Sequence, residues 1–247
     1  REGVAPGNIL AITFTNKAAK EMRDRVISLL LTDRNLNLPA TFDEKPFVST
    51  FHSLGVYLIR ENHAILGLPK HFAIFDRNDS LSAIKQAIAN AGLDPKQHEV
   101  GKILGAISRV KGDMRKIAPE KGYFERIIHA VYNEYEKILQ KEKALDFDDL
   151  LVKTLKLLEV PEILAKYQNR WKFVHIDEYQ DTNTVQYLIS RKLSEAHKNI
   201  CVVGDADQNI YSWRGADIRN ILSFEEDYPS AKVVNLEENY RSTGNIL

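Results

Sequence analysis

Two adjacent carboxylates follow a short, mostly apolar run in the second half of the chain. Phe173–Ile176 has the composition of a buried strand, and Asp177 and Glu178 come directly after it. In open α/β sheets, ligands bind at the carboxyl ends of the strands. A carboxylate there can hold Mg²⁺, and a second one can orient or deprotonate an attacking water. On these residues alone, a simpler alternative stays open: the acidic pair opens the next helix and is favoured by its dipole.

A second polar segment follows the next apolar run. Ile200–Val203 leads into Gly204–Gln208, and aromatic and basic side chains come a few residues later. An amide at the end of a strand could sense a phosphate, while Tyr211, Trp213 and Arg214 offer planar surfaces on which bases can stack. The alternative for Trp213 is a core aromatic. Its position in a glycine-flanked loop weakens that interpretation.

Short strands separated by helical patterns would carry these side chains. Five compact runs have the composition of strands: Ile9–Phe14, Phe47–Thr50, Phe173–Ile176, Ile200–Val203 and Lys232–Leu236. Such runs with helices between them predict buried parallel strands with crossover helices, which is an α/β sheet. The first helix is well marked, because Thr15 and Asn16 can cap it and Lys17–Leu31 carries apolar residues at helical spacing.

The pattern changes between Asp76 and Leu158, where no run predicts a strand. The helices expected there are Ser80–Ala91, Val100–Val110, Tyr123–Glu142 and Asp148–Leu158. An all-helical block between strands of one sheet indicates an inserted subdomain. We therefore expect an α/β domain built from residues 1–75 and 143–235, a helical insertion at 76–142, and the start of a further domain at 236–247.

Composition excludes several classes of protein. The chain has 247 residues, 44% of them hydrophobic, and equal numbers of acidic and basic side chains, so it is not a disordered chain. No apolar run reaches the ~18 residues that a transmembrane helix needs, and the single cysteine, Cys201, excludes a disulfide framework. A net charge of zero argues against binding nucleic acid by bulk charge. The densest basic stretch, from Lys102 to Lys116, is either a solvated helix face or a phosphate-contacting one.

Six strings in the sequence together resemble motifs of the UvrD/PcrA/Rep-type superfamily 1A DNA helicases, in the order in which that family carries them. They resemble motif Ia, motif Ib, the segment that returns from a helical insertion, motif II, motif III and motif IV. The strings are Ala11–Ala19, Ser49–Ser53, Asp146–Leu150, Asp177–Asn183, Gly204–Ala216 and Glu238–Thr243. The resemblance implies a RecA-like P-loop NTPase sheet, domain 1A, with an all-helical inserted subdomain, 1B.

The resemblance also implies roles in ATP hydrolysis, with ATP and Mg²⁺ as the cofactors. Asp177 would bind Mg²⁺ and Glu178 would activate the hydrolytic water. Gln208 would contact the γ-phosphate and couple it to the DNA site. Arg241 would act as an arginine finger, and Tyr240 would stack on adenine. Each role suits phosphoryl transfer, which needs a metal, a positioned water and cationic charge on the transition state.

A second set of positions would contact DNA. The resemblance implies base pockets from aromatic side chains and backbone contacts from small polar ones. The residues are Phe14, Thr15, Asn16, Thr50, His52, Tyr211, Trp213 and Arg214. Stacking surfaces of this kind are what translocation along a single strand requires.

The sequence lacks the G-x-x-x-x-G-K-[ST] loop that cradles nucleotide phosphates. In the family this Walker A loop and its leading strand would precede Arg1, and motifs V and VI would follow Leu247. We therefore expect the first motor domain without its leading strand, together with its insertion. We also expect that the chain alone turns over no ATP.

The function expected of the parent is that of an ATP-dependent 3′-to-5′ DNA helicase in repair or replication. It would translocate on single-stranded DNA and unwind duplex at single-strand/duplex junctions. It would work in the cytoplasm and would not bind a membrane, and the sequence does not indicate its protein partners. Two alternatives stay open. One is a non-catalytic fragment that binds single-stranded DNA, and the other is the motor region of a recombination nuclease–helicase subunit.

Overall fold

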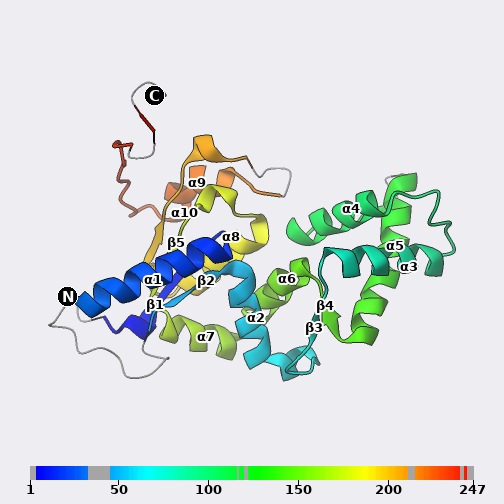
Figure 1. The fold of residues 1–247 in the computed structure, drawn as a ribbon, viewed down its shortest axis with the longest axis horizontal. Helices are drawn as coiled ribbons and strands as arrows, with labels where there is room; N and C mark the ends of the chain where they lie inside the picture. The colour runs from blue at the N-terminus through cyan, green and yellow to red at the C-terminus, as the bar shows by residue number, and fades with distance from the viewer. Residues whose placement is uncertain are drawn as a thin grey trace.

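A parallel four-stranded sheet forms the centre of the computed structural model, which describes residues 4–32, 45–115, 117–119, 122–210, 215–239 and 242–243. Its strands are β1 (Ile9–Thr13), β2 (Phe47–Thr50), β5 (Phe173–Ile176) and β6 (Ile200–Val202), in the spatial order β2-β1-β5-β6. The order differs from the sequence order because helices cross between the strands (Figure 1). The predicted α/β class is confirmed.

One face of the sheet is apolar because helices cover it. Leu10 pairs with Val174 and Ile12 pairs with Ile176, so these four side chains share one face, and all are at most 1% exposed. They belong to the main hydrophobic core, to which four helices contribute. These helices are α2 (Phe51–Glu61), α6 (Phe147–Leu157), α7 (Pro161–Arg170) and α8 (Thr184–Ser194). Along β1 and β2 runs α1 (Asn16–Thr32) (Figure 1).

Three helices form a separate lobe with its own core. They are α3 (Arg77–Asn90), α4 (Val100–Gly112) and α5 (Tyr123–Glu142), and Figure 1 shows them to one side of the sheet. Their buried side chains, among them Ile84, Ile107 and Val131, form a cluster distinct from the main core. A capping box at Asp76 starts α3 three residues before the predicted helix.

A short pair of parallel strands joins the lobe to the sheet domain. β3 (Ala73–Ile74) enters the lobe and β4 (Ala144–Leu145) leaves it, and the Phe75 amide donates to the Leu145 carbonyl at 2.9 Å. The prediction that no strand lies between residues 76 and 158 is therefore wrong at β4. A two-residue strand has no periodicity that a sequence pattern could reveal.

The predicted strand at Lys232–Leu236 is also wrong. No strand is assigned in the described residues after β6, and Val233, Val234 and Leu236 are 65%, 76% and 83% exposed. A segment rich in apolar β-branched residues forms a strand only where a neighbouring strand completes its hydrogen bonds, because β-propensity depends on context. The outer edge of β6 has no such neighbour among the described strands.

The remaining elements are short. They are the 3₁₀ helices η1 (Pro6–Asn8), η3 (His63–Leu66), η5 (Tyr179–Asp181) and η6 (Ala206–Gln208), and the one-turn helices α9 (Arg219–Leu222) and α10 (Phe224–Asp227). None of the helices in the described part of the chain is both long enough and apolar enough to cross a membrane.

Candidate functional site

The carboxyl ends of all four parallel strands lie at one edge of the sheet, and the candidate residues follow those ends. The positions predicted to contact DNA come after β1 and β2, at Phe14–Asn16 and Thr50–His52. The positions predicted to handle metal and phosphate come after β5 and β6, at Asp177, Glu178 and Gln208. Since the spatial order is β2-β1-β5-β6, the two groups occupy adjacent halves of the same edge.

Asp177 stands at the centre of this edge, next to the end of β1. Its backbone amide donates to the Ile12 carbonyl at 2.8 Å, which continues the ladder between β1 and β5. Burial, and then the neighbouring charge of Glu178, raise the pKa of the Asp177 carboxyl. Among the described residues, no basic side chain forms an ion pair with either carboxylate. This uncompensated negative charge favours a bound cation.

Glu178 has a left-handed backbone, with φ of 55°. This conformation is uncommon for a residue other than glycine and marks local strain. Its side chain is exposed, and its Oε2 atom accepts a hydrogen bond from Gln180 Nε2 at 2.8 Å. The turn thus directs Glu178 away from the core while Gln180 fixes its orientation.

Gln180 connects the segments that follow β5 and β6. Its side chain is 1% exposed, and its Oε1 atom accepts from the Asp205 amide at 3.1 Å while its Nε2 atom donates to Glu178. Asn209 Nδ2 donates to the Gln180 carbonyl. Gly204 lies against this bridge, since a Cβ atom there would come within 2.5 Å of Gln180 Oε1. Gln180 was not among the residues predicted from the sequence, although an amide two positions after a pair of carboxylates is a signal that could have found it.

Gln208 lies at the end of η6 and is exposed. Asp205 holds this turn, since its Oδ1 atom accepts from the Asp207 amide at 3.0 Å and its Oδ2 atom accepts from Gln208 Nε2 at 2.7 Å. The amide predicted to sense phosphate is therefore anchored to the same segment that Gln180 ties to Glu178.

Two side chains follow β2 at the other half of the edge. Thr50 is 6% exposed and caps α2, where its Oγ1 atom accepts from the Ser53 amide at 3.2 Å. His52 is partly buried, and burial lowers its pKa, so its imidazole is neutral near pH 7. Its ring packs edge-on against Phe147 at 5.6 Å between centroids, and Phe147 is half-exposed. Phe147 was not among the site residues predicted from the sequence.

The end of β1 supplies a helix N-terminus. Thr15 Oγ1 accepts from the Ala18 amide at 3.1 Å and caps α1, as predicted, and Asn16 begins the helix. Both residues are exposed, and Phe14 is partly buried. The free amide groups and the dipole of a helix N-terminus favour a phosphate. Five other predicted site residues, Tyr211, Trp213, Arg214, Tyr240 and Arg241, lie outside the described residues.

The donor set at Asp177 fits Mg²⁺ better than a metal that needs a full protein cage. In the described ranges, no group of three or more His, Cys, Asp or Glu side chains is arranged to hold a metal ion. Mg²⁺ is commonly bound through one or two carboxylates, with water and substrate phosphates completing its coordination. Asp181, four residues after Asp177, is buried, and one of its carboxyl oxygens has no hydrogen-bond partner among the described residues.

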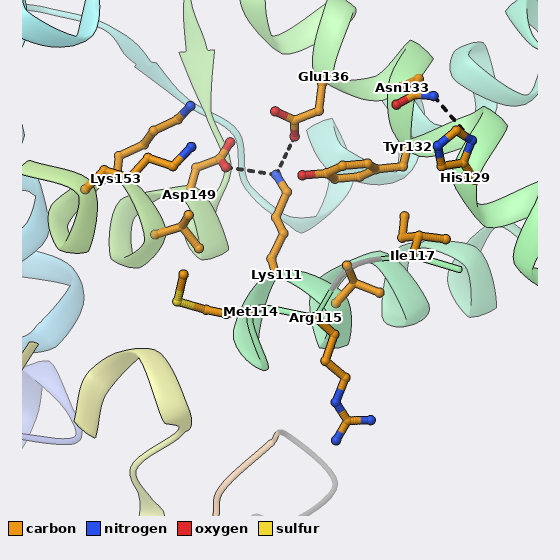
Figure 2. Close-up of a pocket in the computed structure, with 13 residues that line it drawn as sticks. Lys111, Met114, Arg115, Ile117, His129, Tyr132, Asn133, Glu136, Asp149 and Lys153 are labelled. Atoms are coloured by element: carbon orange, nitrogen blue, oxygen red, sulfur yellow. Dashed lines mark hydrogen bonds and ion pairs between the residues drawn. The ribbon is translucent and has the colours of Figure 1, made fainter. Parts of the chain in front are cut away.

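A basic stretch predicted as a possible phosphate-contacting face is divided by the structure. Lys111 is 5% exposed and cannot reach a ligand in solvent. Lys102 and Arg115 are exposed but form ion pairs with Glu99 and Asp113, at 2.7 Å and 3.1 Å. A hollow of about 440 Å³ lies beside Lys111, between the lobe and α6 and away from the strand ends (Figure 2).

The chain matches one protein family and is similar to several curated proteins along almost its whole length. The family described as "UvrD/REP helicase N-terminal domain" matches residues 1–229. The chain is 49% identical over 251 residues to the ATP-dependent DNA helicase PcrA of Bacillus subtilis, which covers 99% of the chain and 32% of that protein. The PcrA proteins of Staphylococcus epidermidis and of Staphylococcus aureus strain Mu50 are 46% and 45% identical, over 99% of the chain and 33% of each protein. The chain thus spans about a third of the length of these curated relatives.

Proposed function

The chain belongs to the UvrD/REP helicase N-terminal domain family, and from that premise we propose that it forms part of the motor of an ATP-dependent DNA helicase. The observation that carries the proposal is the division of one sheet edge. Residues suited to phosphoryl transfer follow β5 and β6, and residues suited to a nucleic-acid backbone follow β1 and β2. A motor needs these two functions next to each other, so that hydrolysis at one can change binding at the other.

In the hydrolytic half, Asp177 would hold Mg²⁺, which supplies charge neutralisation at the phosphates. Glu178 would accept the proton of the attacking water, and its left-handed turn and the hydrogen bond from Gln180 keep its carboxylate in place. Gln208 would contact the γ-phosphate. Because Gln180 also binds the Asp205 amide, a shift at Gln208 is transmitted to Glu178 through one buried side chain.

In the DNA half, the α1 N-terminus at Thr15 and Asn16 would bind a backbone phosphate. His52 would donate a hydrogen bond as a neutral imidazole, while Phe14, Tyr211 and Trp213 would stack on bases. We propose 3′-to-5′ movement along single-stranded DNA and unwinding at junctions with duplex, in DNA repair or replication. The relatives come from bacteria, where such a motor would work in the cytoplasm.

For the chain of residues 1–247 itself, we propose single-strand binding without turnover. The sequence has no phosphate-cradling loop of the form G-x-x-x-x-G-K-[ST], whose lysine would contact the phosphates. ATP hydrolysis by this chain, stimulated by single-stranded DNA, would overturn that part of the proposal.

The central experiment is a titration of a fluorescent oligothymidylate with the chain and with its Trp213→Ala variant. Loss of one stacked base should weaken binding by about 5- to 150-fold, because base–aromatic stacking contributes ~1–3 kcal/mol. Tyr123→Ala is a matched control, since Tyr123 is a 67% exposed aromatic on the lobe, away from the sheet edge. The proposal fails if Trp213→Ala keeps its DNA affinity while its melting temperature drops, because Trp213 would then be a packing residue.

A further inference from the structure

Lys111 is a buried lysine that the proposed hydrolytic and DNA-binding machinery does not use. It lies in the last turn of α4, and its side chain is 3% exposed. Its ammonium nitrogen lies 2.9 Å from Asp146 Oδ2, 2.9 Å from Asp149 Oδ1 and 2.8 Å from Glu136 Oε1. Figure 2 shows Lys111 reaching from α4 toward Glu136 on one side and Asp149 on the other. One cation is thus shared among three carboxylates.

The three carboxylates come from different parts of the fold. Glu136 belongs to α5 of the lobe, whereas Asp146 and Asp149 lie at the start of α6, whose apolar side chains belong to the main core. The ammonium nitrogen of Lys111 therefore forms ion pairs with a carboxylate of the lobe and with two carboxylates at the start of α6. Burial by itself would lower the pKa of Lys111, but Asp146, Asp149 and Glu136 raise it well above its ordinary value, so it stays charged.

Asp146 is fixed from several directions. Its Oδ1 atom caps α6 by accepting from the Asp149 amide at 2.7 Å, and its Oδ2 atom accepts from Tyr135 at 3.0 Å as well as from Lys111. Tyr135 is fully buried in the core of the lobe. The first turn of α6 is consequently held by side chains from both α4 and α5.

The same turn of α6 supports the DNA-facing start of α2. Phe147, next to Asp146, packs against His52. Three residues along α2, Gly55 approaches α6 so closely that a Cβ atom there would come within 2.6 Å of the Leu150 carbonyl oxygen. An unbroken path of contacts therefore runs from Lys111 through the start of α6 to His52.

We propose that Lys111 is a positioning residue, whose ammonium group fixes one orientation of the helical lobe on α6 and so holds the start of α2 in the geometry that binds DNA. A buried ion cluster suits this task because its stability depends on exact placement of several groups, whereas apolar contacts tolerate sliding. Such clusters add little net stability over apolar side chains of the same volume. The part of the proposal that concerns DNA rests on the proposed function.

The test needs a variant that removes the shared cation without stranding all three buried carboxylates; a remaining Asp146 still accepts hydrogen bonds from the Tyr135 hydroxyl and the Asp149 amide. Lys111→Met by itself would strand three carboxylates and could prevent folding. The triple variant Lys111→Met, Asp149→Asn, Glu136→Gln removes the shared cation and two of its partners with side chains of similar size, and it keeps Asp146 as the cap of α6. Lys102→Met is the matched control, because Lys102 is on the same helix and its ion pair with Glu99 is exposed.

The first measurement is the distance distribution between nitroxide labels on the lobe and on the sheet domain. Gln86 on α3 and Lys20 on α1 are exposed and suit Gln86→Cys and Lys20→Cys, in a chain that also carries Cys201→Ser. The distribution should be narrow in the labelled parent and in Lys102→Met, and should widen or split in the triple variant. An unchanged narrow distribution in a folded triple variant would overturn the proposal.

The second measurement is single-strand affinity in a double-mutant cycle with His52→Ala. The triple variant should bind oligothymidylate about 2- to 30-fold more weakly, the range of coupling energies carried between sites in proteins. The loss should not add to that of His52→Ala, because both act through the start of α2. Full additivity, or unchanged affinity despite a widened label distribution, would also overturn it. If the parent chain binds no single-stranded DNA, the proposed function fails while the label distances still test the joint at Lys111.

Discussion

Replacing Gly204 with alanine should break the bridge between the two halves of the hydrolytic site. The added Cβ atom would lie 2.5 Å from Gln180 Oε1, 2.8 Å from Ile221 Cδ1 and 3.2 Å from the Tyr179 amide nitrogen. All three separations are shorter than ordinary van der Waals contact, and the first two are shorter than Cβ atoms in real structures essentially ever show. Gln180 is 1% exposed and cannot swing into solvent, so it must give up its present position and with it the hydrogen bonds to Asp205 and Glu178.

The expected cost follows from these contacts. Overpacking a well-filled site costs ~1–3 kcal/mol, and a lost hydrogen bond costs ~0.5–1.5 kcal/mol, or more when one partner is charged. Since relaxation offsets part of the sum, we expect Gly204→Ala to lower the free energy of unfolding by roughly 2–4 kcal/mol. For a chain of this length, that corresponds to a melting temperature about 4–16 °C lower.

Urea unfolding and thermal melting of the chain measure this cost directly. Gly105→Ala is the matched control, because no atom lies within 4 Å of the position its Cβ would occupy and Gly105 is inside α4. It should stabilise the chain by about 0.5–1 kcal/mol through helix propensity. If Gly204→Ala melted within a degree of the parent while Gly105→Ala behaved as expected, Gln180 would not be a rigid bridge, and the proposed link between Gln208 and Glu178 would be refuted.

Gly55→Ala should cost roughly 2–3 kcal/mol in urea unfolding, because its Cβ would press on the Leu150 carbonyl oxygen, a backbone atom of a buried helix; a cost near zero would mean that α2 and α6 separate easily. Burial, and then Asp146, raise the pKa of Asp148 to about 6, so the stability that its protonated form contributes is present below about pH 4 and is lost as pH rises through about 6. The difference in free energy of unfolding between Asp148→Asn and the parent should therefore grow in favour of the variant by about 1–3 kcal/mol when the pH is raised from about 4.5 to about 7.5. An equal difference at both pH values would contradict the pKa shift. In a longer protein that contains the complete motor, Glu178→Gln should keep nucleotide binding and lower ATP turnover by ~10²–10⁴-fold; near-normal turnover would assign water activation to another residue.

The sequence predicted the local elements of this protein well where a pattern repeats within one segment. The strands at Ile9, Phe47, Phe173 and Ile200 and the helices of the lobe begin within about three residues of their predicted starts. Periodicity explains this success, since α4 and α5 have no side-chain cap, whereas the capping box at Asp76 moves the start of α3 three residues before its predicted start. The placement of candidate residues directly after strands was also visible in the sequence, because strand ends and polar side chains are adjacent in the chain.

Predictions were wrong or missing where a distant segment decides the outcome. Lys232–Leu236 has the composition of a strand, but an edge to pair with is a property of the whole sheet. Lys111 is one of several basic residues in its stretch, and only the packing of α4 on α6 distinguishes it from exposed Lys102. Gln180 is likewise a bridge only because β5 and β6 are neighbours in space.

By itself, the sequence determined the α/β class, the helical lobe and the identities of the side chains that could do chemistry, because periodicity, capping and strand-end positions act over a few residues. The tertiary structure decided the rest. It set the strand order β2-β1-β5-β6, which brings residues more than a hundred positions apart to one edge, and it buried the Lys111 cluster that joins the lobe to the sheet domain. The strand order and the buried cluster both depend on which elements pack against each other and exclude water. Burial is therefore a property of the assembled fold, and no single segment of the chain determines it.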